Sequence, residues 1–131
     1  MIVMNSFKNV LVSLTMAAAL STASTAAFSK PAGEEAVRTA VESAIASLEQ
    51  AVSMLEKGED NAAVSKAIGA ARQQQKEFRF EVTERQRQRA VNTMVKAQAD
   101  LKSGNMQPAE QNLREALASF KEMKAVYDKT H

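Results

Sequence analysis

The chain of 131 residues contains no cysteine and no tryptophan, and it has one histidine, two prolines and four glycines. The absence of cysteine excludes disulfides, thiolate catalysis, cysteine-ligated zinc, iron–sulfur clusters and covalent c-type haem. Few glycines and prolines argue against an all-β fold with many tight turns. The sequence also shows no Ser–His–Asp set and no glycine-rich phosphate loop, so it predicts neither an enzyme nor a cofactor.

The first 29 residues have the order of features of a secretory signal peptide. Lys8 is their only charge, a mostly apolar run extends from Val10 to Leu20, and a stretch of small residues follows. The apolar run is short for a retained membrane anchor, which needs about 20 residues. We therefore predict a signal peptide over 1–29 that is cleaved near 27–29, export to the periplasm, and a helical domain over 30–131 without a transmembrane segment.

Apolar residues recur in steps of three and four along four later segments, as expected for amphipathic helices. These segments are Val37–Leu55, Val64–Ala71, Ala90–Leu101 and Ala109–Tyr127. The chain also repeats itself at a shift of 46 residues without gaps. The matched pairs include Ala44 with Ala90, Leu48 with Met94, Gly58 with Gly104, and Ala67 with Leu113. We predict an all-α fold in which two repeated helical hairpins pack as an antiparallel four-helix bundle.

The connection between the two hairpins has no obvious helix breaker, because residues 70–103 contain no glycine or proline. We expect the connection at 75–83, with Thr83 and Gln86 as a capping box that starts the third helix. The alternative is one central helix of about forty residues, which is above the usual globular length. That alternative predicts a homodimer with hairpins paired between subunits, whereas the compact bundle predicts a monomer.

Gly104, Ala109, Leu113, Ala116 and Leu117 resemble the second half of a tetratricopeptide repeat in the spacing of small and large residues. The chain departs from that family in lacking the aromatic signature of the preceding helix. Its period is also 46 residues, against the roughly 34 typical of the family. The resemblance implies shared hairpin packing.

The layout also resembles the small histidine-rich metal-binding proteins of the periplasm, which have a signal peptide and then two helical hairpins with glycine turns. The segment SMLEKGEDNAAVSKAIGAA carries the first such turn. This resemblance implies sequestration of copper, nickel or zinc. The chain departs from the family in having a single histidine, His131, so no metal ligand is assigned. Of the scattered methionines, Met94 and Met123 are expected to fill the core.

The segment from Arg72 to Arg89 has the most unusual composition. It holds six basic and three acidic residues, a local charge of +3. Arginine and aromatic side chains together are enriched at interaction surfaces. The candidate interaction residues are Arg72, Lys76, Phe78, Arg79, Arg85, Arg87 and Arg89. The opposing interpretation is a solvated helix with Phe78 buried.

We expect a small periplasmic, non-enzymatic interaction protein that acts through its helix faces. Its expected partner is another envelope protein or an anionic envelope surface. Without Lys8 the chain has 16 basic and 15 acidic residues, and so small a net charge argues against nucleic-acid binding. The alternatives are a metal-binding helical bundle and a stress protein without a dedicated ligand.

Overall fold

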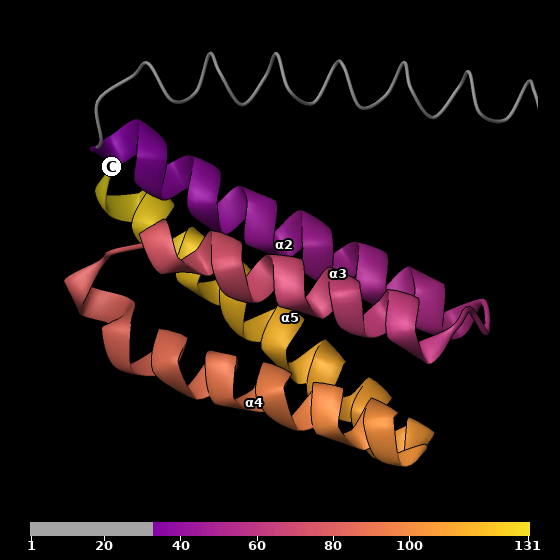
Figure 1. Cartoon of the computed structure of the whole chain (residues 1–131). Helices are drawn as coiled ribbons and strands as arrows, with labels where there is room; N and C mark the ends of the chain where they lie inside the picture. Colours follow the sequence, from indigo (N-terminus) through magenta and orange to yellow (C-terminus); the bar gives the residue numbers. More distant parts are fainter. Residues whose placement is uncertain (1–32) are drawn as a thin grey trace, which may run out of the picture. The chain divides into compact units, whose positions relative to one another are not determined.

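The computed structural model describes residues 33–131, which form four α-helices (Figure 1). The helices are α2 (Glu34–Glu56), α3 (Asn61–Gln74), α4 (Glu84–Ser103) and α5 (Met106–Thr130). Two single 3-10 turns, η1 (Gln75–Glu77) and η2 (Glu81–Thr83), lie between α3 and α4. The predicted signal peptide and its cleavage region lie outside the described residues.

The helices pack in a ring in which each contacts its two sequence or spatial neighbours: α2 with α3, α3 with α4, α4 with α5, and α5 with α2 (Figure 1). Arg38 near the start of α2 pairs with Asp128 near the end of α5, and Glu56 at the end of α2 pairs with Arg114. The helices α2 and α5 are therefore antiparallel, and the predicted four-helix bundle of two hairpins is confirmed. Within residues 33–131, none of the helices has the length and hydrophobicity needed to cross a bilayer.

The core consists of alanines interleaved with larger apolar side chains from all four helices. Many of the larger ones are completely buried, namely Val41, Leu48, Val64, Ile68, Phe78, Met94, Leu113, Phe120 and Met123. Met94 and Met123 thus fill the core as predicted. The buried alanines let the helices approach closely, which explains how so few aromatic residues suffice.

Both hairpins turn on a glycine in the left-handed conformation. Gly58 has φ +74° and Gly104 has φ +80°, values that L side chains rarely adopt. In the first turn the Glu59 amide donates to the Met54 carbonyl at 3.0 Å; in the second the Asn105 amide donates to the Asp100 carbonyl at 2.8 Å. These bonds, five residues apart, identify a Schellman motif at each helix end. The two motifs are related by the predicted shift of 46 residues.

Beyond the turns the shift changes from 46 to 45 residues. The first helices keep the predicted register, since Leu48 and Met94 are both fully buried. Beyond the first turn, however, the buried positions of α3, η1 and the following Phe78 match those of α5 at a shift of 45. The pairs are Val64 with Ala109, Ile68 with Leu113, Ala71 with Ala116, Gln75 with Phe120, and Phe78 with Met123.

Glu59 accounts for the difference of one residue. In the second turn Asn105 both closes the Schellman motif and precedes the first residue of α5. In the first turn Glu59 closes the Schellman motif, and a different residue, Asp60, precedes the first residue of α3. The ungapped repeat beyond Gly58 was therefore wrong by one position, because one turn contains an extra residue.

The connection between the hairpins contains Phe78, whose side chain is fully buried. The chain leaves helical geometry there: Phe78 has φ −82° and ψ 76°, and the Arg79 amide donates to the Glu77 carbonyl at 2.9 Å. This is an inverse γ-turn. Phe80 follows in an extended conformation, and α4 begins four residues later at Glu84. The alternative of one long central helix is therefore wrong.

The start of α4 lies where the sequence predicted it, but the capping box is absent. Thr83 precedes the helix, and its hydroxyl donates to the Phe80 carbonyl at 3.4 Å instead of accepting from the first turn. The N-terminus of α4 has no side-chain cap. Thr83 is buried, and its hydrogen bond to Phe80 closes the η2 turn.

Candidate interaction surface

The bundle separates its charges into two layers. Residues 61–103, which comprise α3, the connection and α4, contain nine basic and four acidic residues, a net charge of +5. We refer to residues 61–103 as the basic layer. In the opposite layer, α2 has one basic and five acidic residues, a net charge of −4, whereas α5 is neutral. Residues 33–131 as a whole have 15 basic and 15 acidic residues, so the net charge hides this separation.

Three of the five acidic residues of α2 pair with cations of α5. Besides the two ion pairs at its ends, Lys121 lies 3.2 Å from Glu49 and Lys124 lies 3.9 Å from Glu42. Four ion pairs thus connect α2 and α5 along their whole length. Each is at least partly exposed and contributes little to stability. Three of the four cations of α5 are nevertheless paired in this way.

The basic layer presents the opposite situation. Seven of its nine cations are exposed, and none of the seven forms an ion pair with a carboxylate of the described chain. Residues 1–32 contain no aspartate or glutamate that would neutralise them. The seven are Lys66, Lys76, Arg79, Arg85, Arg89, Lys96 and Lys102.

The structure divides the predicted interaction residues into two groups. Lys76, Arg79, Arg85 and Arg89 are exposed, and Val82 between them is 73% exposed, the highest value among the large apolar side chains of residues 33–131. Phe78 is fully buried, so it is corrected from a surface residue to a core residue. An alternation of arginine and phenylalanine does not reveal which side chain faces inward when the segment is not helical.

Arg72 and Arg87 are half-buried and hold the bundle together. The Arg72 guanidinium donates to Gln98 Oε1 at 2.8 Å, which joins α3 to α4. Arg87 pairs with Glu84 and also donates to Gln75 Oε1. Gln75 is buried and donates to the Arg72 carbonyl at 2.8 Å, so the amide satisfies both its donor and its acceptor. These two arginines therefore fix the connection and leave the candidate surface to the exposed cations.

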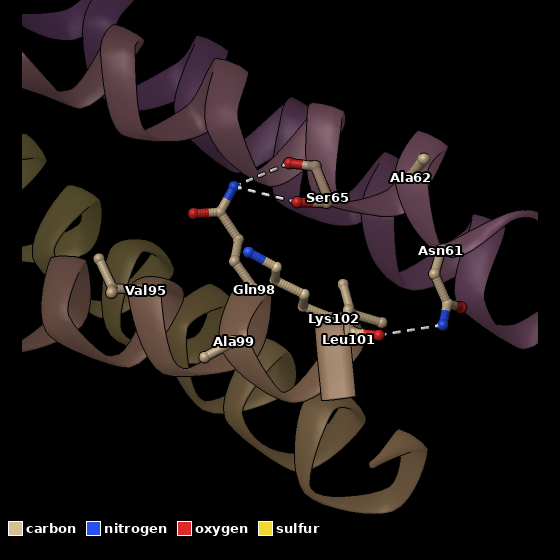
Figure 2. Close-up of a pocket in the computed structure, with 8 residues that line it drawn as sticks. All are labelled: Asn61, Ala62, Ser65, Val95, Gln98, Ala99, Leu101 and Lys102. Atoms are coloured by element: carbon tan, nitrogen blue, oxygen red, sulfur yellow. Dashed lines mark hydrogen bonds between the residues drawn. The ribbon is translucent and has the colours of Figure 1, made fainter. Parts of the chain in front are cut away.

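An open groove of about 700 Å³ lies between α3 and α4 (Figure 2). It is lined by three residues of α3 and five of α4, namely Asn61, Ala62, Ser65, Val95, Gln98, Ala99, Leu101 and Lys102. Gln98 Nε2 donates to the Ser65 carbonyl at 2.9 Å, and Asn61 Nδ2 donates to the Leu101 carbonyl at 3.2 Å. Amide side chains thus bridge the two helices along the groove.

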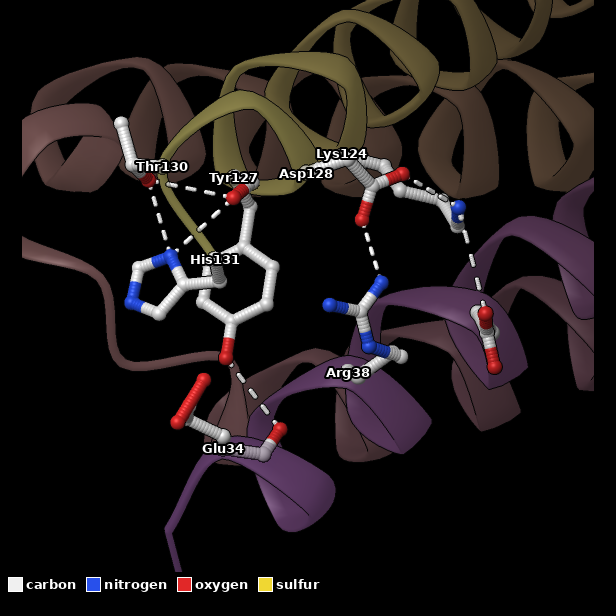
Figure 3. Close-up of polar contacts among 8 residues, drawn as sticks. Glu34, Arg38, Lys124, Tyr127, Asp128, Thr130 and His131 are labelled. Carbon is white, nitrogen blue, oxygen red and sulfur yellow. Dashed lines mark hydrogen bonds and ion pairs between the residues drawn. The ribbon is translucent and has the colours of Figure 1, made fainter.

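An aromatic cluster at the other end of the bundle was not predicted from the sequence. Tyr127 is buried, and the His131 ring stacks on it with 4.0 Å between centroids (Figure 3). Phe80 meets the Tyr127 ring edge-on at 5.2 Å. Arg38 lies over the same ring at 5.3 Å from its centroid. The residues come from α2, the connection and α5, and no local spacing brings them together.

The electrostatics of this cluster follow from its contacts. Burial raises the pKa of Tyr127, an effect that Glu34 increases and Arg38 opposes. Hydrogen bonds from Lys124 and Arg38 lower the pKa of Asp128. The only histidine, His131, contacts the Tyr127 carbonyl and the Thr130 hydroxyl through Nδ1. The cluster therefore joins the start of α2, the connection and the end of α5.

The metal-binding alternative requires a group of ligands in space. Among residues 33–131, no three histidine or carboxylate side chains lie close enough together to hold a metal ion. Met94 and Met123 are fully buried in the core. The basic layer is therefore the most distinctive surface of the described domain.

Comparison of the chain with protein families, with curated proteins and with solved structures yields no match in any of the three.

Proposed function

We propose that this protein is a non-enzymatic interaction protein of the periplasm that binds an anionic partner through its basic layer. The observation that carries the proposal is the contrast between the two layers of the bundle. Three of the four cations of α5 pair with carboxylates of α2, whereas seven cations of the basic layer are exposed and have no carboxylate partner in the described chain.

Unpaired surface cations repel one another and cost stability, so a partner that neutralises them gains favourable interaction energy. Arg79 and Arg85 flank the exposed Val82 on the connection. Arginine next to an exposed apolar side chain is a combination enriched at protein interfaces. The connection and the adjoining ends of α3 and α4 therefore form the part of the basic layer that we assign to first contact.

The test is capture of envelope components by immobilised protein and by two charge-reversed variants. The double substitution Arg79→Glu and Arg85→Glu removes two cations of the basic layer. The matched control, Lys57→Glu with Lys129→Glu, changes the net charge equally at exposed positions outside that layer. We expect capture by the wild-type protein and the control to fall as salt is raised. Capture by the first variant should be lost at every salt concentration.

Helicity measured by circular dichroism should be the same for all three proteins, because the substituted side chains are exposed. Equal capture by the two variants would show that net charge alone, and not the basic layer, attracts the partner. A stoichiometric metal adduct in native mass spectrometry after exposure to copper, nickel or zinc would favour the metal-binding alternative instead.

A further inference from the structure

The groove between α3 and α4 has the chemistry of a docking site for another helix. We infer that it seats an acidic amphipathic helix of a partner protein, and this inference rests on the function proposed above. The groove is open, mostly apolar and about 700 Å³ in volume, and it lies within the basic layer (Figure 2). Val95, one of only three large apolar side chains exposed in residues 33–131, lines it with 42% of its surface accessible.

The amide nitrogens of Asn61 and Gln98 in the groove are already occupied. Asn61 and Gln98 donate to carbonyl oxygens of the facing helices, and Gln98 Oε1 accepts from Arg72. Pockets for small polar ligands need several converging groups that remain available. The interactions that remain available to a bound partner are apolar contacts with Ala62, Val95 and Ala99, and attraction to the positive charge at the rim of the groove. Such a surface suits the apolar face of an amphipathic segment.

A helix fits this surface better than an extended peptide. Residues 33–131 contain no strand, so there is no sheet edge to which an extended peptide would add. A shallow groove between two antiparallel helices instead receives the side-chain ridges of a third helix. The small side chains of Ala62 and Ala99 allow its backbone to approach closely.

The charge around the groove predicts that the docked helix is acidic. The two helices that flank it contain seven basic residues and two acidic ones. Both acidic residues already have partners: Glu84 pairs with Arg87, and Asp100 accepts from Asn112 of α5. Lys102 lines the groove itself, and Lys66 is exposed on α3. Glutamates on the outer edges of a docked helix would reach these cations.

A second copy of this chain is a poor occupant. Its most acidic helix is α2, but Glu42, Glu49 and Glu56 are already paired with cations of α5. Docking α2 against the groove would require those pairs to break. A lipid surface would meet the protruding cations of the basic layer but would not fill a groove. The partner is therefore a separate acidic helix.

The experiment measures binding of a synthetic amphipathic peptide of about five helical turns to the full domain by fluorescence anisotropy. Leucine and alanine form one face of the peptide, and glutamate the other. A control peptide has lysine in place of every glutamate. We expect saturable binding of the acidic peptide, with a Kd at least about tenfold lower than that of the lysine peptide, a difference of about 1.4 kcal/mol.

Groove-filling variants then locate the binding. Ala62→Gln with Ala99→Gln fills the groove without changing charge, and glutamine is a good helix former. The matched control is Ala118→Gln with Ala125→Gln at exposed positions of α5. We expect the groove variant to bind the acidic peptide at least about tenfold more weakly, and the control to bind it as the wild-type protein does.

The outcomes separate this inference from the proposed function. If Arg79→Glu with Arg85→Glu abolishes capture while the groove variant binds the acidic peptide normally, the groove is not the seat, although the basic layer remains the contact surface. If vesicles containing anionic phospholipid bind better than the peptide and groove filling has no effect, a lipid surface replaces the helix. If neither substitution changes any binding, both proposals are wrong.

Discussion

The Tyr127 hydroxyl donates a hydrogen bond to the main-chain oxygen of Glu34 at 3.2 Å, and this bond joins the last turns of α5 to the first residue of α2. The tyrosine ring lies against Phe78, Phe80 and His131 at the same time. One side chain therefore connects the beginning of the bundle, its end and the connection between its hairpins.

Replacing Tyr127 by phenylalanine should lower the free energy of unfolding by about 1 kcal/mol. The ring and its packing remain, whereas the hydrogen bond to Glu34 is lost. Urea unfolding followed by circular dichroism measures the change. An unaltered midpoint would mean that water replaces the hydroxyl at the Glu34 carbonyl without loss.

The same tyrosine should give the protein an alkaline limit of stability. Burial raises its pKa in the folded state, whereas in the unfolded chain it titrates near the usual value of about 10. Its contribution is therefore complete below about pH 10 and is lost as the pH rises through the folded-state pKa. Because lysines titrate in the same range, the measured quantity is the difference in stability between the wild-type protein and Tyr127→Phe. That difference should shrink or reverse in alkaline solution.

Phe78→Ala should destabilise the protein by about 3–5 kcal/mol, since it removes a fully buried aromatic side chain. Val82→Ala in the same connection is the control, because Val82 is 73% exposed, and it should change stability by no more than about 0.5 kcal/mol. Thermal unfolding distinguishes them. Similar losses in the two variants would show that the connection is stabilised by its backbone and not by Phe78.

Two glycine-to-alanine substitutions should have opposite effects. Gly104→Ala places a Cβ on a residue with φ +80° and should cost about 1–2 kcal/mol, although nothing lies within 4 Å of the new atom. Gly69→Ala lies within α3, where the new Cβ would meet Gln98 Nε2 at 3.6 Å, an ordinary contact. Because alanine favours helix over glycine, this variant should gain up to about 1 kcal/mol. A shift of melting temperature in the same direction for both would contradict the assignment of Gly104 to the left-handed conformation and of Gly69 to a helix.

Deleting Glu59 should preserve the fold, because the second turn already works without an equivalent residue. Asp60 would then take both positions that Asn105 holds in the second turn. Deleting Ala67 within α3 is the control, since it rotates every later buried residue of that helix by about 100°. Circular dichroism and thermal unfolding should show a cooperative transition for the first deletion and its loss for the second.

The sequence predicts the helices and both hairpin turns because those features depend on local chemistry. Apolar spacing identifies the buried faces, and a glycine in the left-handed conformation ends α2 and α4. The extra residue Glu59 was not predicted, because each turn has a glycine at the equivalent position. Only the pattern of buried residues beyond the turn reveals the offset.

Two other features depend on contacts between distant residues. The helix break at Phe78 follows from its burial beside Tyr127, which is 49 positions away in the sequence. Likewise, the sequence indicates a basic segment from Arg72 to Arg89. It does not reveal that Lys66, Lys96 and Lys102 extend the same layer. Nor does it reveal that Arg72 and Arg87 form hydrogen bonds within the bundle. Both require knowledge of which helices are neighbours.

The break between α3 and α4 is conditional, because packing and not glycine or proline creates it. When Phe78 leaves the core, no residue from 70 to 103 prevents the two helices from joining into one. The connection at residues 75–83 thus depends on the packing of one side chain, whereas the two hairpin turns depend on the backbone conformation of Gly58 and Gly104. A substitution that weakens this packing therefore acts on the connection and leaves the two glycine turns unchanged.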